Sequence, residues 1–197
     1  MKQAINKRYL FAAAMLLVGV LGAVTAQAAT FRGVVGFGFD LGGDTLVTAV
    51  YTDGSTVNVK ANQGLVLNGG VVMVTGSFET QATVGYKFGG PTAKNGSITF
   101  DVIPVELMEF YRTSNLRMGA GFTYHNSPKL VIDIPGTNAT YQFDNALGAV
   151  VQIGWAPEKS PLSIDLRYTA IKYKQSNIAN PADISGKAVG LYMGYYF

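Results

Sequence analysis

The nine residues Val189-Gly-Leu-Tyr-Met-Gly-Tyr-Tyr-Phe197 form a period-two pattern at the end of the sequence. Every second position is apolar or aromatic: Val189, Leu191, Met193, Tyr195 and Phe197. The positions between them hold only glycine and tyrosine. Successive side chains of a β-strand point to opposite faces, so the stretch predicts a strand with one continuous apolar face.

The same alternation recurs upstream, in residues 80–88, 116–124, 147–155 and 162–170. Lipid offers no hydrogen-bond partners, so strands that cross a bilayer close into a barrel whose side chains alternate between lipid and lumen. A soluble β-sandwich also alternates, but it would not place so many large apolar side chains on its outer face. The sequence therefore predicts an all-β fold, a transmembrane antiparallel up-and-down β-barrel.

The connections between these segments alternate in length. Short links fall at residues 76–79, 112–115 and 156–161, and longer ones at 89–96, 126–144 and 174–187. Outer-membrane barrels have short periplasmic turns and longer outer loops. We therefore expect about eight strands, with both chain termini on the periplasmic side.

The beginning of the chain has the composition of an export signal. Lys2, Lys7 and Arg8 precede an uncharged stretch, residues 9–26, which ends in the small-x-small pattern Ala26-Gln27-Ala28. A retained transmembrane helix would be longer and would end in a polar anchor. Residues 1–28 are predicted to be a cleaved signal peptide, and residues 29–197 the barrel.

Charge and composition exclude several functions. Removing the three bases of residues 1–28 from the 15 in the chain leaves 12, which equals the number of acids, and no basic stripe predicts nucleic-acid binding. The chain has no cysteine and one histidine, so we expect no disulfide, metal site or cofactor.

The first hairpin allows two interpretations. Segments 45–52 and 55–60 flank Asp53-Gly54, a type I′ turn signal, and pairing about that turn places Phe31 opposite Gly76. We expect residues 31–41 and 66–76 to be membrane-embedded and the remainder to project outside. A ten-stranded barrel with residues 44–52 as another crossing is the alternative.

Two further irregularities are expected. Ile98, Phe100 and Val102 differ in parity from Val105 and Leu107, which suggests a bulge near Pro104, a residue without a ladder donor. A second projecting hairpin is predicted, with arms 130–134 and 139–143.

Together these features resemble the small outer-membrane barrels of the OmpA, OmpX and OmpW type. In such barrels a final aromatic strand is recognised by the assembly machinery, and Tyr195 and Phe197 match that signal. The resemblance implies a bacterial outer-membrane location, contact with outer-membrane lipid and lipopolysaccharide, and a monomer. It is one of architecture, so it carries over no functional residue.

Inward parity assigns eight charged side chains to the lumen: Arg32, Asp40, Lys87, Asp101, Glu106, Arg117, Asp165 and Arg167. Side chains can fill an eight-stranded barrel, and unpaired charges there are costly, so the balanced set predicts an internal salt-bridge network. Glu106 with Arg117, and Asp165 with Arg167, are the pairs considered first. An ion or proton pathway is the rival interpretation.

His125 and Ser127 stand two apart, as in the His-x-Ser arrangement of lipid A deacylases, which also use a Glu. Here Pro128 follows at once and no Glu lies in the next stretch, so a solvated rim histidine is expected and no catalytic residue is predicted.

We therefore expect a non-enzymatic barrel that anchors surface-exposed loops, as a surface antigen, an adhesin or an envelope-integrity factor. The alternative is a small channel for hydrophobic or small solutes, which lumen-facing glycines would favour if they leave a cavity. A lipid A-modifying enzyme is the distant third hypothesis.

Overall fold

The computed structural model describes residues 29–51, 53–93 and 96–197. The predicted signal peptide, with Ala26 and Ala28, lies outside these residues. Eight long strands make up the barrel: β1 (Thr30–Gly42), β4 (Gly64–Thr75), β5 (Phe78–Gly89), β7 (Gly96–Arg112), β8 (Leu116–Ile134), β10 (Ala146–Trp155), β11 (Leu162–Ala170) and β14 (Ala188–Tyr196). Six short strands extend it: β2 (Thr45–Val50), β3 (Thr56–Lys60), β6 (Thr92–Ala93), β9 (Thr137–Gln142), β12 (Lys172–Tyr173) and β13 (Ile184–Ser185).

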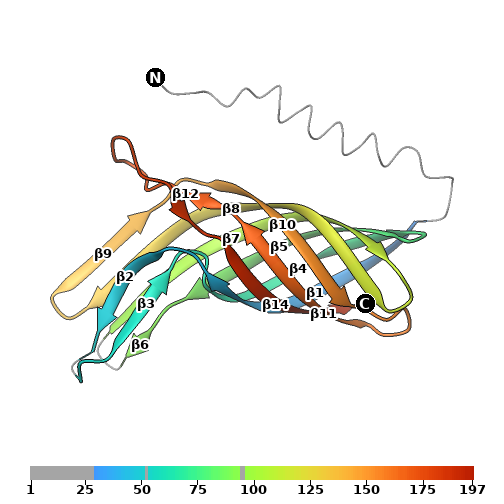
Figure 1. The fold of residues 1–197 in the computed structure, drawn as a ribbon, viewed down its shortest axis with the longest axis horizontal. Coiled ribbons are helices and arrows are strands. Elements are labelled where there is room, and N and C mark those ends of the chain that lie inside the picture. Colours follow the sequence, from blue (N-terminus) through green and yellow to red (C-terminus); the bar gives the residue numbers. More distant parts are fainter. Residues whose placement is uncertain (1–28, 52, 94–95) are drawn as a thin grey trace.

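The long strands form a closed antiparallel ring in the order β7-β5-β4-β1-β14-β11-β10-β8, and β8 pairs again with β7 (Figure 1). The final residue contributes to closure, because Phe197 and Gly33 exchange backbone hydrogen bonds of 2.8 and 3.0 Å. β2 and β3 pair only with each other, in a separate two-stranded sheet. The prediction of eight crossing strands is therefore confirmed, and the ten-stranded alternative is wrong.

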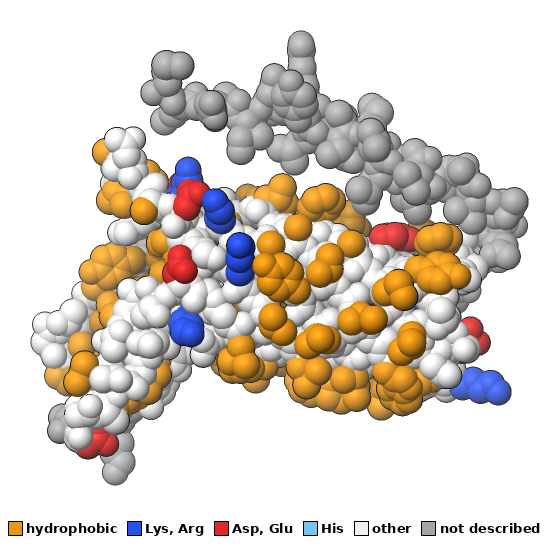
Figure 2. Space-filling model, viewed as in Figure 1, with side chains coloured by type: hydrophobic (Ala, Val, Ile, Leu, Met, Phe, Trp, Pro, Cys, Tyr) orange, Lys and Arg blue, Asp and Glu red, His pale blue; other side chains and the backbone are white. Residues whose placement is uncertain are grey.

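The outer wall carries exposed apolar side chains on all eight long strands, and Figure 2 shows one face of this belt. On β8 the outward positions include Leu116, Met118 and Phe122, which are 48–50% exposed. The positions between them face the interior, and Arg117 among them is 2% exposed. This is the predicted alternation, and its cause is that one face of every strand meets lipid while the other meets the lumen.

The links also alternate as predicted. Tight turns join β4 to β5, β7 to β8 and β10 to β11, and Thr30 and Phe197 lie at that same end, called here the turn end. The other end, the loop end, holds the longer connections and all six short strands (Figure 1). No helix of the described residues is long and apolar enough to cross a membrane.

The register of the first hairpin differs from the prediction. Phe31 pairs with Met73 rather than with Gly76, because the ladder does not run unbroken from the Asp53-Gly54 turn. It is interrupted by Gly42 and Gly43, with φ of 138° and 84°, and by Asn62 at φ 68°. These conformations redirect the chain, so β2 and β3 leave the ring and β1 and β4 pair in a register of their own.

The predicted bulge lies on the neighbouring strand. The β7–β8 register shifts between Asp101 and Ile103, and the extra residue belongs to β8, where Ser127 has φ of 51°. β7 keeps one parity, and Phe100 and Val102 are buried inside the barrel rather than facing lipid. The second hairpin is confirmed as β8 extended to Ile134 and paired with β9.

Candidate functional site

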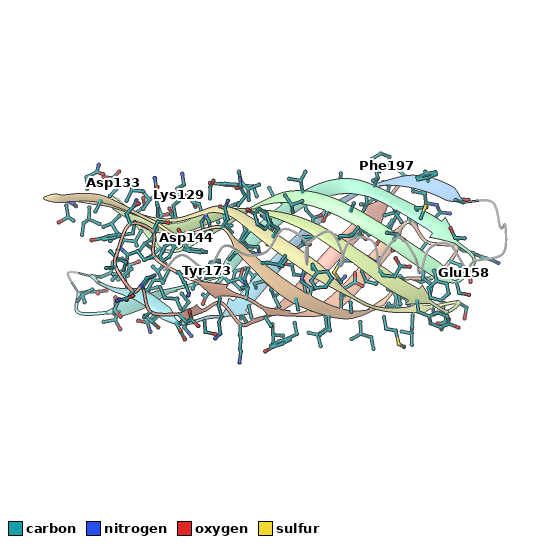
Figure 3. All side chains as sticks on the ribbon, turned by 90° about the horizontal axis from the view of Figure 1, so that it is seen from above. Lys129, Asp133, Asp144, Glu158, Tyr173 and Phe197 are labelled. Carbon is teal, nitrogen blue, oxygen red and sulfur yellow. The ribbon has the colours of Figure 1, made fainter. Side chains whose placement is uncertain are left out.

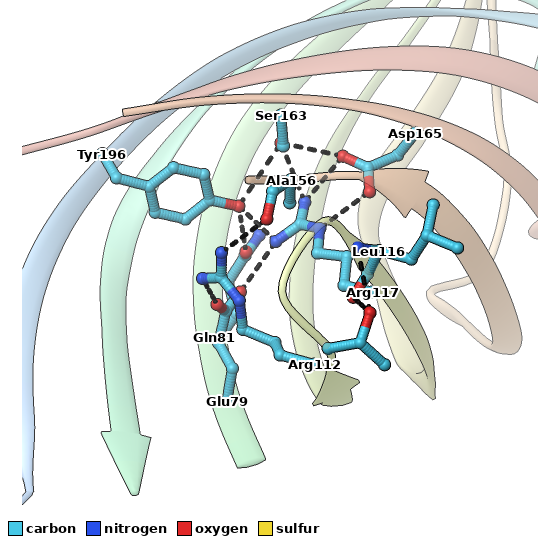
Figure 4. A network of polar contacts seen from close by, with 10 residues as sticks. Glu79, Gln81, Arg112, Leu116, Arg117, Ala156, Ser163, Asp165 and Tyr196 are labelled. Carbon is cyan, nitrogen blue, oxygen red and sulfur yellow. Dashed lines mark hydrogen bonds and ion pairs between the residues drawn. The ribbon is translucent and has the colours of Figure 1, made fainter. Parts of the chain in front are cut away.

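The lumen near the turn end holds a network of charged side chains centred on Arg117 (Figure 4). Its guanidinium donates to Asp165 through Nε, at 2.7 Å, and through Nη2, at 2.6 Å. Nη1 donates to Glu79 Oε1, at 2.7 Å, and to the hydroxyl of Tyr196. The Arg117 guanidinium carbon also lies 4.3 Å from the centroid of the Phe110 ring. We call this group the lower network.

Two further side chains complete the lower network. Arg112 donates from Nη1 to Glu79 Oε2, at 2.5 Å, and from Nη2 to the backbone oxygen of Ala156, at 2.9 Å. Ser163 donates to Asp165 Oδ2, at 2.9 Å. Glu79 and Asp165 are at most 1% exposed, so these hydrogen bonds replace the water that both carboxylates would otherwise bind.

Gly154 makes the central pair of the lower network possible. It stands between Arg117 and Asp165, because β10 pairs Gly154 with Arg117 on one side and with Asp165 on the other. A Cβ at Gly154 would overlap Asp165 Oδ1 and would lie 2.6 Å from the backbone oxygen of Ile164. The missing side chain therefore allows an ion pair to form across an intervening strand.

A second group, the upper network, lies further toward the loop end. Lys87 Nζ donates to Asp40 Oδ2, at 2.5 Å, and to Asn62 Oδ1, at 2.6 Å, and the Tyr192 hydroxyl donates to Asp40 Oδ2, at 2.6 Å. Arg167 pairs with Glu106, and its guanidinium carbon lies 4.6 Å from the centroid of the Tyr192 ring. Gly190 stands between Asp40 and Arg167 in the ring, as Gly154 stands between the lower pair.

An apolar plug fills the barrel beyond the upper network. It consists of Val59, Ala61, Ile98, Phe100, Val102, Leu130, Phe143, Ala146, Ile171 and Tyr173, all at most 7% exposed. Leu46, Val47 and Ala49 of β2 pack against it, so one face of the first hairpin covers the plug instead of facing water. Asn62 fixes the base of that hairpin, because its Nδ2 donates to the backbone oxygen of Gly186 at 2.8 Å.

Aromatic rings occupy space that lumen glycines leave. A Cβ at Gly38 would lie 2.5 Å from the Tyr192 ring, and one at Gly119 would overlap Phe110. These glycines therefore accommodate side chains of the interior rather than line an open cavity.

The structure places six of the eight predicted lumen residues in the two networks, with the partners exchanged. Arg117 pairs with Asp165, and Arg167 pairs with Glu106. The predicted pairs joined each arginine to the other acid. Parity determines which face a side chain occupies but not its height along the barrel. The ring register decides the height and hence the partner.

The other two predicted residues, Arg32 and Asp101, lie outside both networks. Arg32 has inward parity but stands exposed at the turn-end mouth, and no ion pair among the described residues includes it. Asp101 shares the outward parity of Ile103 and lies beside the Tyr86 hydroxyl, because β7 does not change parity at Pro104.

The predicted charge set did not include six further members of the two networks: Asn62, Glu79, Arg112, Ser163, Tyr192 and Tyr196. Glu79 and Arg112 fall at the ends of segments that looked like turns. Extending the alternation of each neighbouring strand by one residue into the predicted turn would have placed both side chains inside the barrel. Nothing in the sequence pattern places Asn62, whose lumen position depends on where the first hairpin leaves the ring.

His125 and Ser127 are not brought together as a base and a nucleophile. His125 is 1% exposed, with Nδ1 2.6 Å from the Tyr173 hydroxyl, so the expected solvated rim histidine is wrong. Ser127 is exposed at the β8 bulge, and its backbone nitrogen donates to Asn145 Oδ1 at 2.9 Å. No group of three or more His, Cys, Asp or Glu able to hold a metal occurs among residues 29–51, 53–93 and 96–197.

Charges of both signs lie on the outside of the barrel at the loop end. Lys129, Asp133 and Asp144 are labelled there in Figure 3, opposite Glu158 at the turn end. Lys172 and Lys174 both approach Asp183, with Nζ to carboxylate distances of 2.9 and 3.6 Å. Opposite charges therefore pair along this rim.

We expect the pKa of Asp183 to lie below its ordinary value, because Lys172 hydrogen-bonds the carboxylate and attracts it. The contact is present above that pKa and is lost as the pH falls through it. Lys172→Gln should raise the pKa of Asp183 toward its ordinary value, measured by NMR titration of the carboxyl carbons. Asp53 is the internal control, since Ser55 hydrogen bonds lower its pKa. An Asp183 pKa that Lys172→Gln leaves unchanged would contradict the pairing.

The closed eight-stranded ring and its apolar belt are the fold of the small bacterial outer-membrane β-barrels. Among solved structures, Ail, the attachment invasion locus protein of Yersinia pestis, crystallised with the heparin analogue sucrose octasulfate, is 13% identical. That alignment covers 87% of this chain and 99% of Ail, with a TM-score of 0.53.

Two other barrels match with lower scores. They are Neisserial surface protein A (11% identity, 87% of this chain and 100% of that chain, TM-score 0.49) and the outer membrane protein AlkL (14%, 89% and 94%, TM-score 0.41). No protein-family model and no curated protein sequence matches the chain. At such identities the likeness to Ail establishes the fold alone.

Proposed function

We propose that this protein is a non-enzymatic outer-membrane barrel that anchors a surface-exposed β-sheet, and that the sheet binds a protein partner outside the cell. The filled lumen carries the proposal. Along the axis, a solute would meet the lower network, the upper network and then the apolar plug. Side chains packed in this way favour an anchor over a small-solute channel.

The proposal places both termini in the periplasm and the loop end outside. The apolar belt would contact outer-membrane lipid, and the charged rim would meet the headgroups of lipopolysaccharide. Tyr195 and Phe197 stack on the outer wall, with ring centroids 6.4 Å apart, where the assembly machinery can reach them.

A protruding sheet distinguishes the loop end. β7 and β8 have 17 and 19 residues, whereas roughly 10 suffice to cross a membrane, and β9 adds a further strand beyond the ring. Ile134 and Tyr141 are 40% and 43% exposed on this sheet. The extension offers apolar contact area above the membrane.

The outer edge of β9 has backbone groups available for pairing. Phe143 donates its N–H to the oxygen of Pro128, at 2.9 Å, which identifies the hydrogen-bonded positions of the β8–β9 ladder. By alternation, Asn138 and Thr140 point their N–H and C=O groups away from β8. β9 ends the order of its sheet in the described part of the chain, so an extended segment of a partner can add to this edge.

The rim charges favour a polypeptide partner over a polyanion. Acidic Asp133, Asp144 and Asp183 lie at the loop end together with Lys129, Lys172 and Lys174, so a sulfated glycan would meet repulsion as well as attraction. Ail was crystallised with a sulfated ligand. A heparin coating is therefore the informative comparison with protein coatings in a test on this chain.

Thr140→Pro should abolish binding through the β9 edge while leaving β8 pairing intact, because it removes one outward N–H. The assay is retention of Gram-negative cells producing the protein on surfaces coated with fibronectin, laminin or heparin. We expect wild-type cells to be retained on a protein coating and Thr140→Pro cells to fall to the vector level.

Thr140→Val is the matched control, since it changes the side chain and keeps the N–H, and it should bind as wild type. Retention of Thr140→Pro cells equal to wild type would contradict edge pairing. Two results would contradict a protein-binding surface. One is wild-type retention no higher than that of the vector cells on both protein coatings, and the other is wild-type retention on the heparin coating alone.

A further inference from the structure

A shallow groove of about 830 Å³ crosses the lipid-facing wall. It lies between two rows of outward side chains that the strand register aligns. One row contains Tyr111, Met118, Ile153 and Leu166, and the other Glu109, Ala120, Val151, Tyr168 and Val189. The groove is deepened by two small residues: Ala120, whose side chain protrudes less than the others of the second row, and Gly119, which lies between the rows. The groove is apolar along its length except at the Glu109 end.

The groove rises through the membrane from the turn end toward the loop end. Glu109 is three residues from the end of β7 at the turns, whereas Val189 is the second residue of β14 at the loop end. Four steps between neighbouring strands separate them, which at about 4.8 Å a step make roughly 19 Å. This length and slope suit an extended acyl chain.

Glu109 is a carboxylate on a wall that otherwise faces lipid. The Thr80 hydroxyl donates to its Oε2 at 2.7 Å. None of the ion pairs within residues 29–51, 53–93 and 96–197 includes Glu109. An acidic side chain on the lipid face is destabilising in a depth-dependent way. A cation that also donates hydrogen bonds would offset that cost.

We propose that the groove binds one phospholipid with a primary ammonium headgroup, phosphatidylethanolamine, in the periplasmic leaflet. The ammonium donates to Glu109, and an acyl chain lies along the groove past Ala120 toward Val189. A choline headgroup carries the same charge but has no N–H, and a phosphatidylglycerol headgroup has no cation. The carboxylate therefore selects phosphatidylethanolamine from the three. This site is additional to the surface sheet of the proposed function.

The test is native mass spectrometry of the protein released from vesicles with equal amounts of phosphatidylethanolamine, phosphatidylcholine and phosphatidylglycerol. We expect one retained lipid, enriched several-fold in phosphatidylethanolamine. Glu109→Gln should remove the enrichment. Glu158→Gln, at an exposed turn of the same end, is the matched control and should preserve it. Ala120→Leu fills the groove and should lower retention of all three lipids.

Folding is checked independently by heat-modifiable gel migration, so failure to insert is distinguished from failure to bind lipid. Equal retention of the three lipids by the folded wild type would overturn the proposal, as would enrichment that survives Glu109→Gln. A dimer lost on Glu109→Gln would also overturn it, because the occupant would then be a second copy of this chain.

Discussion

Replacing Arg117 with Met is expected to destabilise the barrel by about 3–5 kcal/mol, because it leaves the buried Asp165 carboxylate without its cation. Asp165 would keep only the Ser163 hydroxyl, and Glu79 would keep Arg112. Tyr196 would lose its contact with the guanidinium. The measurement is urea unfolding of the protein refolded into vesicles.

Arg32→Met is the matched control. Arg32 is exposed and lies in no ion pair of the described residues, so we expect a change within about 0.5 kcal/mol. Adding Asp165→Leu to Arg117→Met should recover part of the loss, since it removes the uncompensated charge. Equal stability of Arg117→Met and Arg32→Met would show that the lower network does not support the fold.

Gly154→Ala is expected to cost about 2–3 kcal/mol, although it adds a single methyl group. The new Cβ would overlap Asp165 Oδ1, and the neighbouring Ile164 backbone oxygen leaves it little room to shift. The Asp165 carboxylate must then move away from Arg117, so the substitution both overpacks the site and weakens its central ion pair. Urea unfolding in vesicles measures this loss as well.

Gly69→Ala provides the comparison within the same fold. A Cβ at Gly69 would meet its nearest neighbours at 3.7 and 3.9 Å, which is ordinary contact. We expect it to be neutral or slightly stabilising, since alanine restricts the unfolded chain. Similar losses of stability in Gly69→Ala and Gly154→Ala would contradict this explanation. They would mean that Gly154 is needed for backbone freedom rather than to let Arg117 reach Asp165.

The wall of the barrel was predictable from sequence because lipid imposes a strict rule on every crossing strand. Leu116, Met118 and Phe122 had to share a face, and the link lengths then indicated the number of strands. Local patterns of a few residues were sufficient for this part of the fold.

The interior was only partly predictable, since its contacts join residues far apart in the sequence. Parity placed Arg117 and Asp165 inside, but only the ring register brings them to one height, across Gly154. Asp101 was assigned to the lumen on the assumption that β7 bulges at Pro104, whereas the extra residue is on β8. The first hairpin was misregistered because left-handed residues such as Asn62 interrupt its ladder.

Glu109 illustrates the opposite case. Its outward position could be predicted from the alternation of β7, but an acidic residue does not fit the apolar pattern of a lipid-facing wall. Its parity is that of Leu107 and Tyr111, which face lipid. The role of a charged residue at such a position depends on its neighbours. Only the strand register shows that Glu109 lies at the turn end of the apolar groove, which is the basis for proposing that it binds an ammonium headgroup.

The central claim is that the barrel is a filled anchor, and single-channel recording in planar bilayers tests it most directly. Residues 29–197, refolded and shown to be folded by heat-modifiable migration, should give a silent bilayer, because two charge networks and the apolar plug occupy the lumen in series. Stable conductance steps that change in size with Arg117→Met would contradict this account and make the protein a pore.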